Sequence, residues 1–169
     1  NEGVDIDNPT IDNGSPTDVP TPTKNRAVKG SIRVPSMLDG VAQVSAVGQA
    51  YNVKPGLSLG RAEFSNYGQT IDFAAPGDQI YSTATTLFYR SGYAVADGTS
   101  MATPQMAGVS AVVLQRVQSD PLFASMSARE KVDVVQNLIM GTARPIADAA
   151  QETGVFYSPR KQGSGIVDA

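Results

Sequence analysis

A serine in a run of small residues is the strongest candidate for chemistry in this sequence. Ser100 stands in GTSMATPQMAG, residues 98–108, where a helical pattern begins. A serine hydroxyl becomes a nucleophile only when a base removes its proton and hydrogen-bond donors stabilise the oxyanion that forms. The first turn of a helix offers free N–H groups and the positive end of the helix dipole. The alternative is that Thr99 or Ser100 is simply the N-cap of the helix, which is the commoner role of such residues.

The composition excludes several classes of site. The 169 residues include no cysteine and no histidine, which excludes a thiolate nucleophile, a disulfide framework and a cysteine-ligated zinc ion. The base for Ser100 is therefore not a histidine of this chain. With 13 basic and 16 acidic residues and a net charge of −3, we expect no nucleic-acid partner. No apolar run approaches the ~20 residues of a membrane span, so we expect none, and any bound metal would be a hard, oxygen-ligated ion.

The elements that position Ser100 follow from the hydrophobic pattern. Residues 1–35 are rich in Asp, Asn, Thr and Pro and are expected to form a long loop. The run VAQVSAVG, residues 41–48, predicts a strand buried on both faces. The short runs TIDFAAPG and QIYSTATT, which follow later, predict strand and turn. Strands that alternate with helices indicate an α/β layered domain.

Two helices are expected in the second half of the chain. The first runs from Ser100 to about Gln118, and nearly all of it is expected to be buried because small residues fill the side opposite its apolar stripe. The second begins with Ser127 as N-cap and Glu130 three residues later, which is a capping-box pattern, and Gly141 is expected to end it. Its apolar face is formed by three residues, Val132, Val135 and Ile139. The tail SPRKQGSGIVDA predicts a turn that runs into a short strand or a last helix.

Four blocks of the sequence, in order, resemble subtilisin-like serine proteases, the subtilases. They are NEG at residues 1–3, VPSMLDGVAQVSAVG, FSNYGQTIDFAAPGDQIYSTA leading into GTSMATP, and the tail SPRKQGSGIVDA. The resemblance runs through most of the chain, and the tail is similar to the large cell-envelope subtilases of Gram-positive bacteria, the lactocepin and C5a-peptidase group. It implies an α/β fold, the C-terminal portion of a three-layer αβα domain with a mostly parallel sheet. The interval between Asn1 and Ser100 has no room for the extra domain that this group usually inserts there.

The resemblance also implies residue roles. Ser100 is implied as the nucleophile, with its own N–H as one oxyanion donor and the side-chain amide of Asn1 as the other. Glu2 and Gly3 are implied to line the substrate-binding pocket, with an ordinary surface loop as the alternative. Asp72 matches a position that helps hold a weak cation in some subtilases, but one carboxylate is far short of a calcium site, so a turn cap is the favoured role. We therefore assign no metal ion and expect no cofactor, although a structural calcium ion is compatible with the full-length parent.

In subtilases the triad follows the chain order Asp, His, Ser, so the resemblance implies that acid and base lie upstream of residue 1. Residues 1–169 are then expected to be the C-terminal part of a secreted or cell-surface endopeptidase domain, with the loop at 1–35 and the sheet and helices at 36–169. Alone, it is expected to be inactive and to self-associate. Its expected partners are a protein or peptide substrate and the remaining N-terminal part of the domain.

Other interpretations remain open from the sequence. Asp97, three residues before Ser100, is a candidate base, but it is more consistent with a solvent-exposed turn residue. Gln105 replaces a histidine that often follows the motif proline in subtilases. That histidine is structural, so its replacement is expected to leave the chemistry untouched. A sedolisin-type acid peptidase also carries GTS-x-x-x-P and uses a glutamate base. A non-catalytic pseudoprotease or binding module would keep the sheet and the Ser100 helix without hydrolysis.

Overall fold

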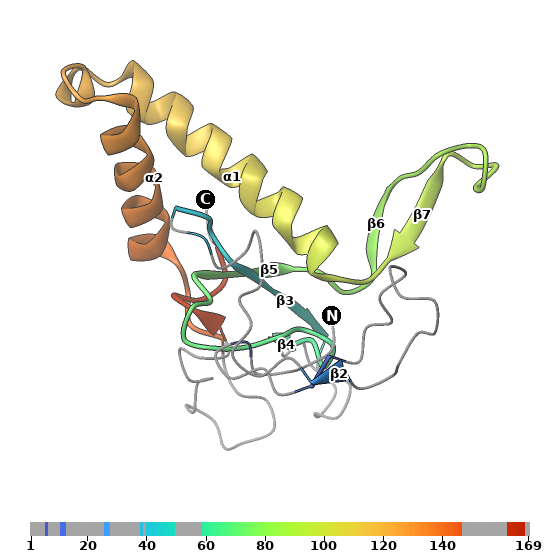
Figure 1. The fold of residues 1–169 in the computed structure, drawn as a ribbon. Coiled ribbons are helices and arrows are strands. Elements are labelled where there is room, and N and C mark those ends of the chain that lie inside the picture. Colours follow the sequence, from blue (N-terminus) through green and yellow to red (C-terminus); the bar gives the residue numbers. More distant parts are fainter. Residues whose placement is uncertain are drawn as a thin grey trace.

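The computed structural model describes Ile6, residues 11–12, 26–27, Leu38, residues 40–49, 59–146 and 162–167. The elements in chain order are β1 (Ile11–Asp12), β2 (Arg26–Ala27), β3 (Val44–Gln49), β4 (Leu59–Arg61), β5 (Phe73–Pro76), β6 (Ile80–Thr83), β7 (Tyr93–Ala96), α1 (Thr99–Ser119), the 3₁₀ turn η1 (Pro121–Phe123) and α2 (Ala128–Thr142). Helix α1 lies along the sheet, α2 packs beside it, and β6 and β7 form a hairpin that projects from the body (Figure 1). The expected α/β class is confirmed.

The central sheet has the strand order β4–β3–β5. β3 pairs with β5 in parallel, from Val44 opposite Phe73 to Val47 opposite Pro76, and with β4 in antiparallel. The sheet of the described segments is therefore mixed. β4 lies in a segment for which the sequence predicts no strand, because only three residues of it pair and its flanks are punctuated by glycine and proline.

Strand β3 is buried on both faces, as its sequence predicts. Ala46 and Ala75 pack against Ala102 of α1 on one face. On the other face, Val47 and Ala74 pack with Ile146. This alternation follows from the period of two in a strand, which sends neighbouring side chains to opposite sides of the sheet.

The expectation that nearly all of α1 is buried is wrong. The helix itself is confirmed within one residue of each expected end, but only Ala102, Met106 and Val117 are buried. The residues on the side away from the sheet, Ala107 and Ala111 among them, are exposed. Small and apolar residues lie on all sides of α1, but among the described segments nothing packs against the side that faces away from the sheet.

Helix α2 begins as predicted and ends later than predicted. The capping box is complete: the Ser127 hydroxyl accepts from the Glu130 N–H, and the Glu130 carboxylate accepts from the Ser127 N–H. The C-cap is Ala143 rather than Gly141, which lies inside the last turn. Val135 and Ile139 are buried, whereas Val132 is exposed, because the face that packs against α1 is narrower than the apolar stripe.

The remaining described segments add short strands. β1 and β2 form an antiparallel pair of two residues each within 1–35, where only a loop is expected. β7 was also not predicted from the sequence, and it pairs with β6 in antiparallel. In the tail, Ile166 bridges to Ala74 and to Arg144, which agrees with a turn that leads into a short strand. Among the described residues, no helix is both long and apolar enough to cross a bilayer.

Candidate active site

Ser100 lies in the first turn of α1 and is not its N-cap. The N-cap is Gly98, which makes no side-chain capping bond, so Thr99 and Ser100 occupy the first two helical positions. The first amides bonded back to the Gly98 carbonyl are those of Met101 (3.0 Å) and Ala102 (3.4 Å). The side chain of Ser100 is exposed and, among the described residues, has no hydrogen-bond partner. Because this hydroxyl neither caps the helix nor bonds to another described residue, it is available to a reacting molecule.

The backbone on either side of this turn is tightly packed. Gly98 has φ 150° and ψ 160°, a conformation that is essentially restricted to glycine. Its N–H donates to the Gly77 carbonyl (2.7 Å), and the Gly77 N–H donates to the carbonyl of Val47, the last residue of β3 that pairs with β5 (2.8 Å). A Cβ atom on Gly77 would lie 2.7 Å from both the Gly98 oxygen and the Ala46 Cβ. Two glycines are thus needed for the helix to begin this close to the sheet.

This packing places the start of α1 at the carboxyl ends of two parallel strands. β3 and β5 run in the same direction, and the turn through Gly77 that follows β5 carries the contact to Gly98. Open α/β sheets bind ligands at the carboxyl ends of their strands. The first turn of α1 carries no acidic residue. Within this turn, therefore, no carboxylate neutralises the positive end of the helix dipole. The arrangement favours an anion that forms next to Ser100.

Gln105 fastens α1 to the end of β5. Its side-chain amide donates to the Pro76 carbonyl at 2.8 Å and to the Met101 carbonyl at 3.4 Å. A donor is what this position requires, since both partners are carbonyl oxygens. Through these two hydrogen bonds Gln105 holds the first turns of α1 against the end of β5.

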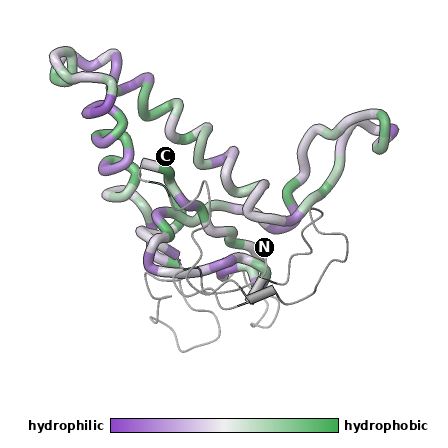
Figure 2. The backbone as a smooth tube through the Cα atoms, in the orientation of Figure 1, coloured by the Kyte–Doolittle hydropathy of each residue, from purple (hydrophilic) through white to green (hydrophobic). Residues whose placement is uncertain are grey.

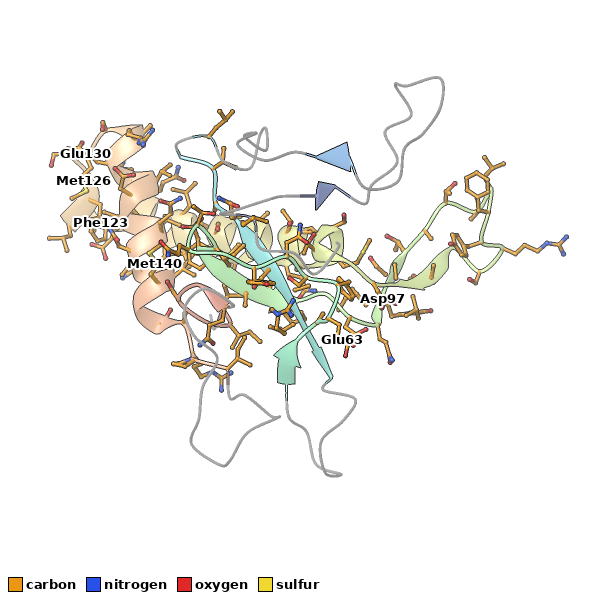
Figure 3. The ribbon with its side chains drawn as sticks, turned by 60° about the horizontal axis from the view of Figure 1, so that its bottom comes forward. Glu63, Asp97, Phe123, Met126, Glu130 and Met140 are labelled. Carbon is orange, nitrogen blue, oxygen red and sulfur yellow. The ribbon has the colours of Figure 1, made fainter. Side chains whose placement is uncertain are left out.

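Asp97 holds the base of the β6–β7 hairpin. Its carboxylate accepts a hydrogen bond from the N–H of Gln79, a residue with φ 54°, at 2.5 Å. Figure 3 places Asp97 where the hairpin joins the body of the molecule. This contact supports the turn role over the role of a base. The sequence did not predict the hydrogen bond between Asp97 and Gln79, because the two residues are 18 positions apart in the chain.

Of the remaining candidate site residues, the structure describes Asp72. Asn1, Glu2 and Gly3 lie outside the described residues. Asp72 accepts from the Gln43 N–H at 2.7 Å, where β3 and β5 begin to pair, which fits a cap rather than a cation ligand. Among the residues that the structure describes, no group of acidic side chains is suited to hold a metal ion. The sequence did not predict the contact between Gly77 and Gly98, although these residues stand in the motifs TIDFAAPG and GTSMATPQMAG.

Comparison with known proteins adds three findings. The Peptidase_S8 family model, described as the subtilase family, matches residues 3–165. A C5a peptidase of Streptococcus pyogenes is 31% identical over 114 residues, which cover 64% of this chain and 9% of the relative. A PII-type proteinase of Lactococcus lactis subsp. cremoris is 34% identical over 118 residues, which cover 63% of this chain and 6% of the relative. The matched segment therefore spans less than a tenth of either relative's length.

Among solved structures, fervidolysin from Fervidobacterium pennivorans, a keratinolytic enzyme related to subtilisin, matches with a TM-score of 0.56 and 24% identity. The match covers 79% of this chain and 19% of that one. At this identity the likeness supports the fold alone.

Proposed function

Because the chain belongs to the subtilase family of peptidases, we propose that it is the serine-bearing part of an endopeptidase domain, with Ser100 as the nucleophile. The observation that carries the proposal is the position of Ser100: exposed, in the first turn of α1, and beside the carboxyl ends of β3 and β5. The N-cap role that would otherwise account for this serine belongs to Gly98.

The proposed reaction is acyl transfer. The Ser100 hydroxyl attacks a peptide carbonyl while a base takes its proton, the amine leaves with a proton, and water then hydrolyses the acyl-enzyme. The Ser100 N–H and the Asn1 side-chain amide stabilise the oxyanion, and Glu2 and Gly3 line the pocket for the substrate side chain. This chemistry needs no cofactor.

The base and the acid of the proposed triad belong to polypeptide beyond these 169 residues. The chain contains no histidine, and the Asp97 carboxylate already accepts the Gln79 N–H. The proposal therefore includes a partner segment that carries Asp and His in the family's order. Without it, the chain should have only the small residual activity that positioning provides.

We further propose a secreted or cell-surface location in a Gram-positive bacterium. Support comes from the organisms of the two curated relatives, a Streptococcus and a Lactococcus. A protein or peptide is the proposed substrate.

A fluorophosphonate probe with Ser100→Ala tests the proposal. In the protein that includes the partner segment, the probe should label Ser100 stoichiometrically, and the substitution should remove both labelling and peptide hydrolysis. Ser119→Ala is the matched control, because Ser119 is an exposed serine at the other end of the same helix. This chain alone should label slowly or not at all. Full hydrolysis by the Ser100→Ala variant would refute the role of Ser100, and a wild-type protein that is inert to probe and peptide would favour a non-catalytic binding module.

A further inference from the structure

The β6–β7 hairpin presents large apolar side chains to solvent over its whole length. Leu87 and Phe88 at its tip are 80% and 77% exposed, and Tyr81 on β6 is 68% exposed. Tyr89, Tyr93 and Val95 are exposed as well. Figure 2 shows hydrophobic residues at the tip, away from the body of the molecule. An exposed patch of this kind on one element marks an interaction surface.

The strand part of this surface is one ordered face. Tyr81 pairs with Val95, and Thr83 pairs with Tyr93, so these four side chains share one side of the hairpin. The rings of Tyr81 and Tyr93 stack with their centroids 5.3 Å apart. Nothing in the described fold covers this face, and the two strands pair only with each other there. Within the part of the chain that the structure describes, both outer strand edges are therefore open to an extended peptide.

The hairpin is held in place relative to Ser100. Strand β7 ends at Ala96, and the chain passes through Asp97 directly to the N-cap Gly98. The bond from the Gln79 N–H to the Asp97 carboxylate closes the base of the hairpin at this point. A molecule bound along the hairpin is thus held beside the start of α1.

The size and charge of the surface suit a peptide segment better than a second copy of the chain. Two four-residue strands ~4.8 Å apart that rise ~3.3 Å per residue give a face on the order of 100 Å², far less than the ~800 Å² that each partner contributes to a stable interface. From Gln79 to Ala96, Arg90 is the one charged residue. The matching partner is an apolar, extended stretch of polypeptide.

We propose that the β6–β7 hairpin is an exosite that binds apolar residues of the polypeptide substrate away from the scissile bond. The inference rests on the proposed function of Ser100. The four residues of β7 span ~13 Å, and an extended substrate advances ~3.3 Å per residue. The exosite therefore contacts substrate residues about four or more positions from the bond that is cut. Short peptides do not reach it, and long apolar ones do.

The test compares two fluorogenic peptides in the protein that includes the partner segment. One is a six-residue core, and the other is the same core extended on both sides by seven residues that include Leu, Phe and Tyr. In the wild type, the extension should raise kcat/KM about tenfold, the scale of a few buried apolar contacts. The double variant Leu87→Ser and Phe88→Ser should lose this gain and cleave the core as the wild type does.

Leu122→Ser is the matched control, since Leu122 is 76% exposed but lies in η1, beyond the far end of α1. It should keep the gain. Retention of the gain by the double variant would overturn the exosite, as would equal losses on both peptides, which would mean that the hairpin docks on the rest of the domain. A change of oligomeric state in the double variant would identify a second copy as the occupant and would also overturn the proposal. A wild type that cleaves neither peptide would instead refute the proposed function.

Discussion

At the scale of single residues, two glycines determine where the Ser100 hydroxyl lies. The motif GTS is also compatible with an N-capping serine, and the choice between the two roles depends on which residue adopts the cap conformation. Gly98 adopts it, and the Gly77 carbonyl accepts its N–H. Ser100 then lies two residues after the N-cap, in the first turn of the helix, and faces solvent.

We predict opposite effects for two glycine-to-alanine substitutions. Gly77→Ala should lower the free energy of unfolding by about 1–3 kcal/mol, because its Cβ would meet the Gly98 oxygen and the Ala46 Cβ at 2.7 Å. Gly108→Ala should raise it by about 0.5–1 kcal/mol, because this helical site has no atom within 4 Å of an added Cβ. Urea-induced unfolding measures both. Equal stabilities for the two variants would show that the Gly77 contact relaxes without cost.

At the scale of elements, the capping box of α2 shows how far local sequence determines structure. Ser127 and Glu130 are three residues apart, and both of their reciprocal bonds form as predicted. The Ser127 hydroxyl, followed by its backbone N–H, holds the pKa of Glu130 below its ordinary value of 4.5. The charged form of Glu130 is therefore favoured in the folded state.

The lowered pKa of Glu130 predicts the direction of a pH effect. A carboxyl with a lower pKa in the folded state contributes stability above its unfolded pKa and loses it as the pH falls through the folded pKa. Glu130→Gln should therefore reduce stability at pH 7, and the difference from the wild type should shrink as the pH is lowered below 4.5. Urea unfolding at several pH values measures this, with Ser125→Ala, an exposed serine outside the box, as a control. A difference that grows in acid would contradict the assignment.

At the scale of the whole molecule, one side of α1 is open. Val112 is 64% exposed, and Ala107, Gly108 and Ala111 are exposed beside it. The sequence predicts this surface to be buried, and in the described segments it is not. The uncovered side of α1 therefore offers an apolar surface through which the chain by itself would associate.

Self-association through this side of α1 can be measured directly. Sedimentation of the isolated chain should show species larger than a monomer that increase with concentration. Val112→Glu should shift the distribution towards monomer, because a buried unpaired carboxylate is costly. Gln118→Glu, at an exposed polar position of the same helix, should leave the distribution unchanged. A wild-type chain that stays monomeric at high concentration would contradict self-association through this side of α1.

By itself, the sequence determined the features that depend on neighbours a few residues apart. These are a helix predicted from Ser100 and observed from Thr99, the N-cap of α2 at Ser127, and a strand in VAQVSAVG that is buried on both faces. The motif also identified Ser100 as the candidate nucleophile. Periodicity and capping are local interactions, so they can be read from a short window.

Only the tertiary structure decided which side of α1 is covered, that Gly98 rests on Gly77, and that Asp97 bonds to Gln79. These contacts join residues 18 or more positions apart. Burial and close approach depend on what the rest of the chain brings to a surface, and no local pattern contains that information.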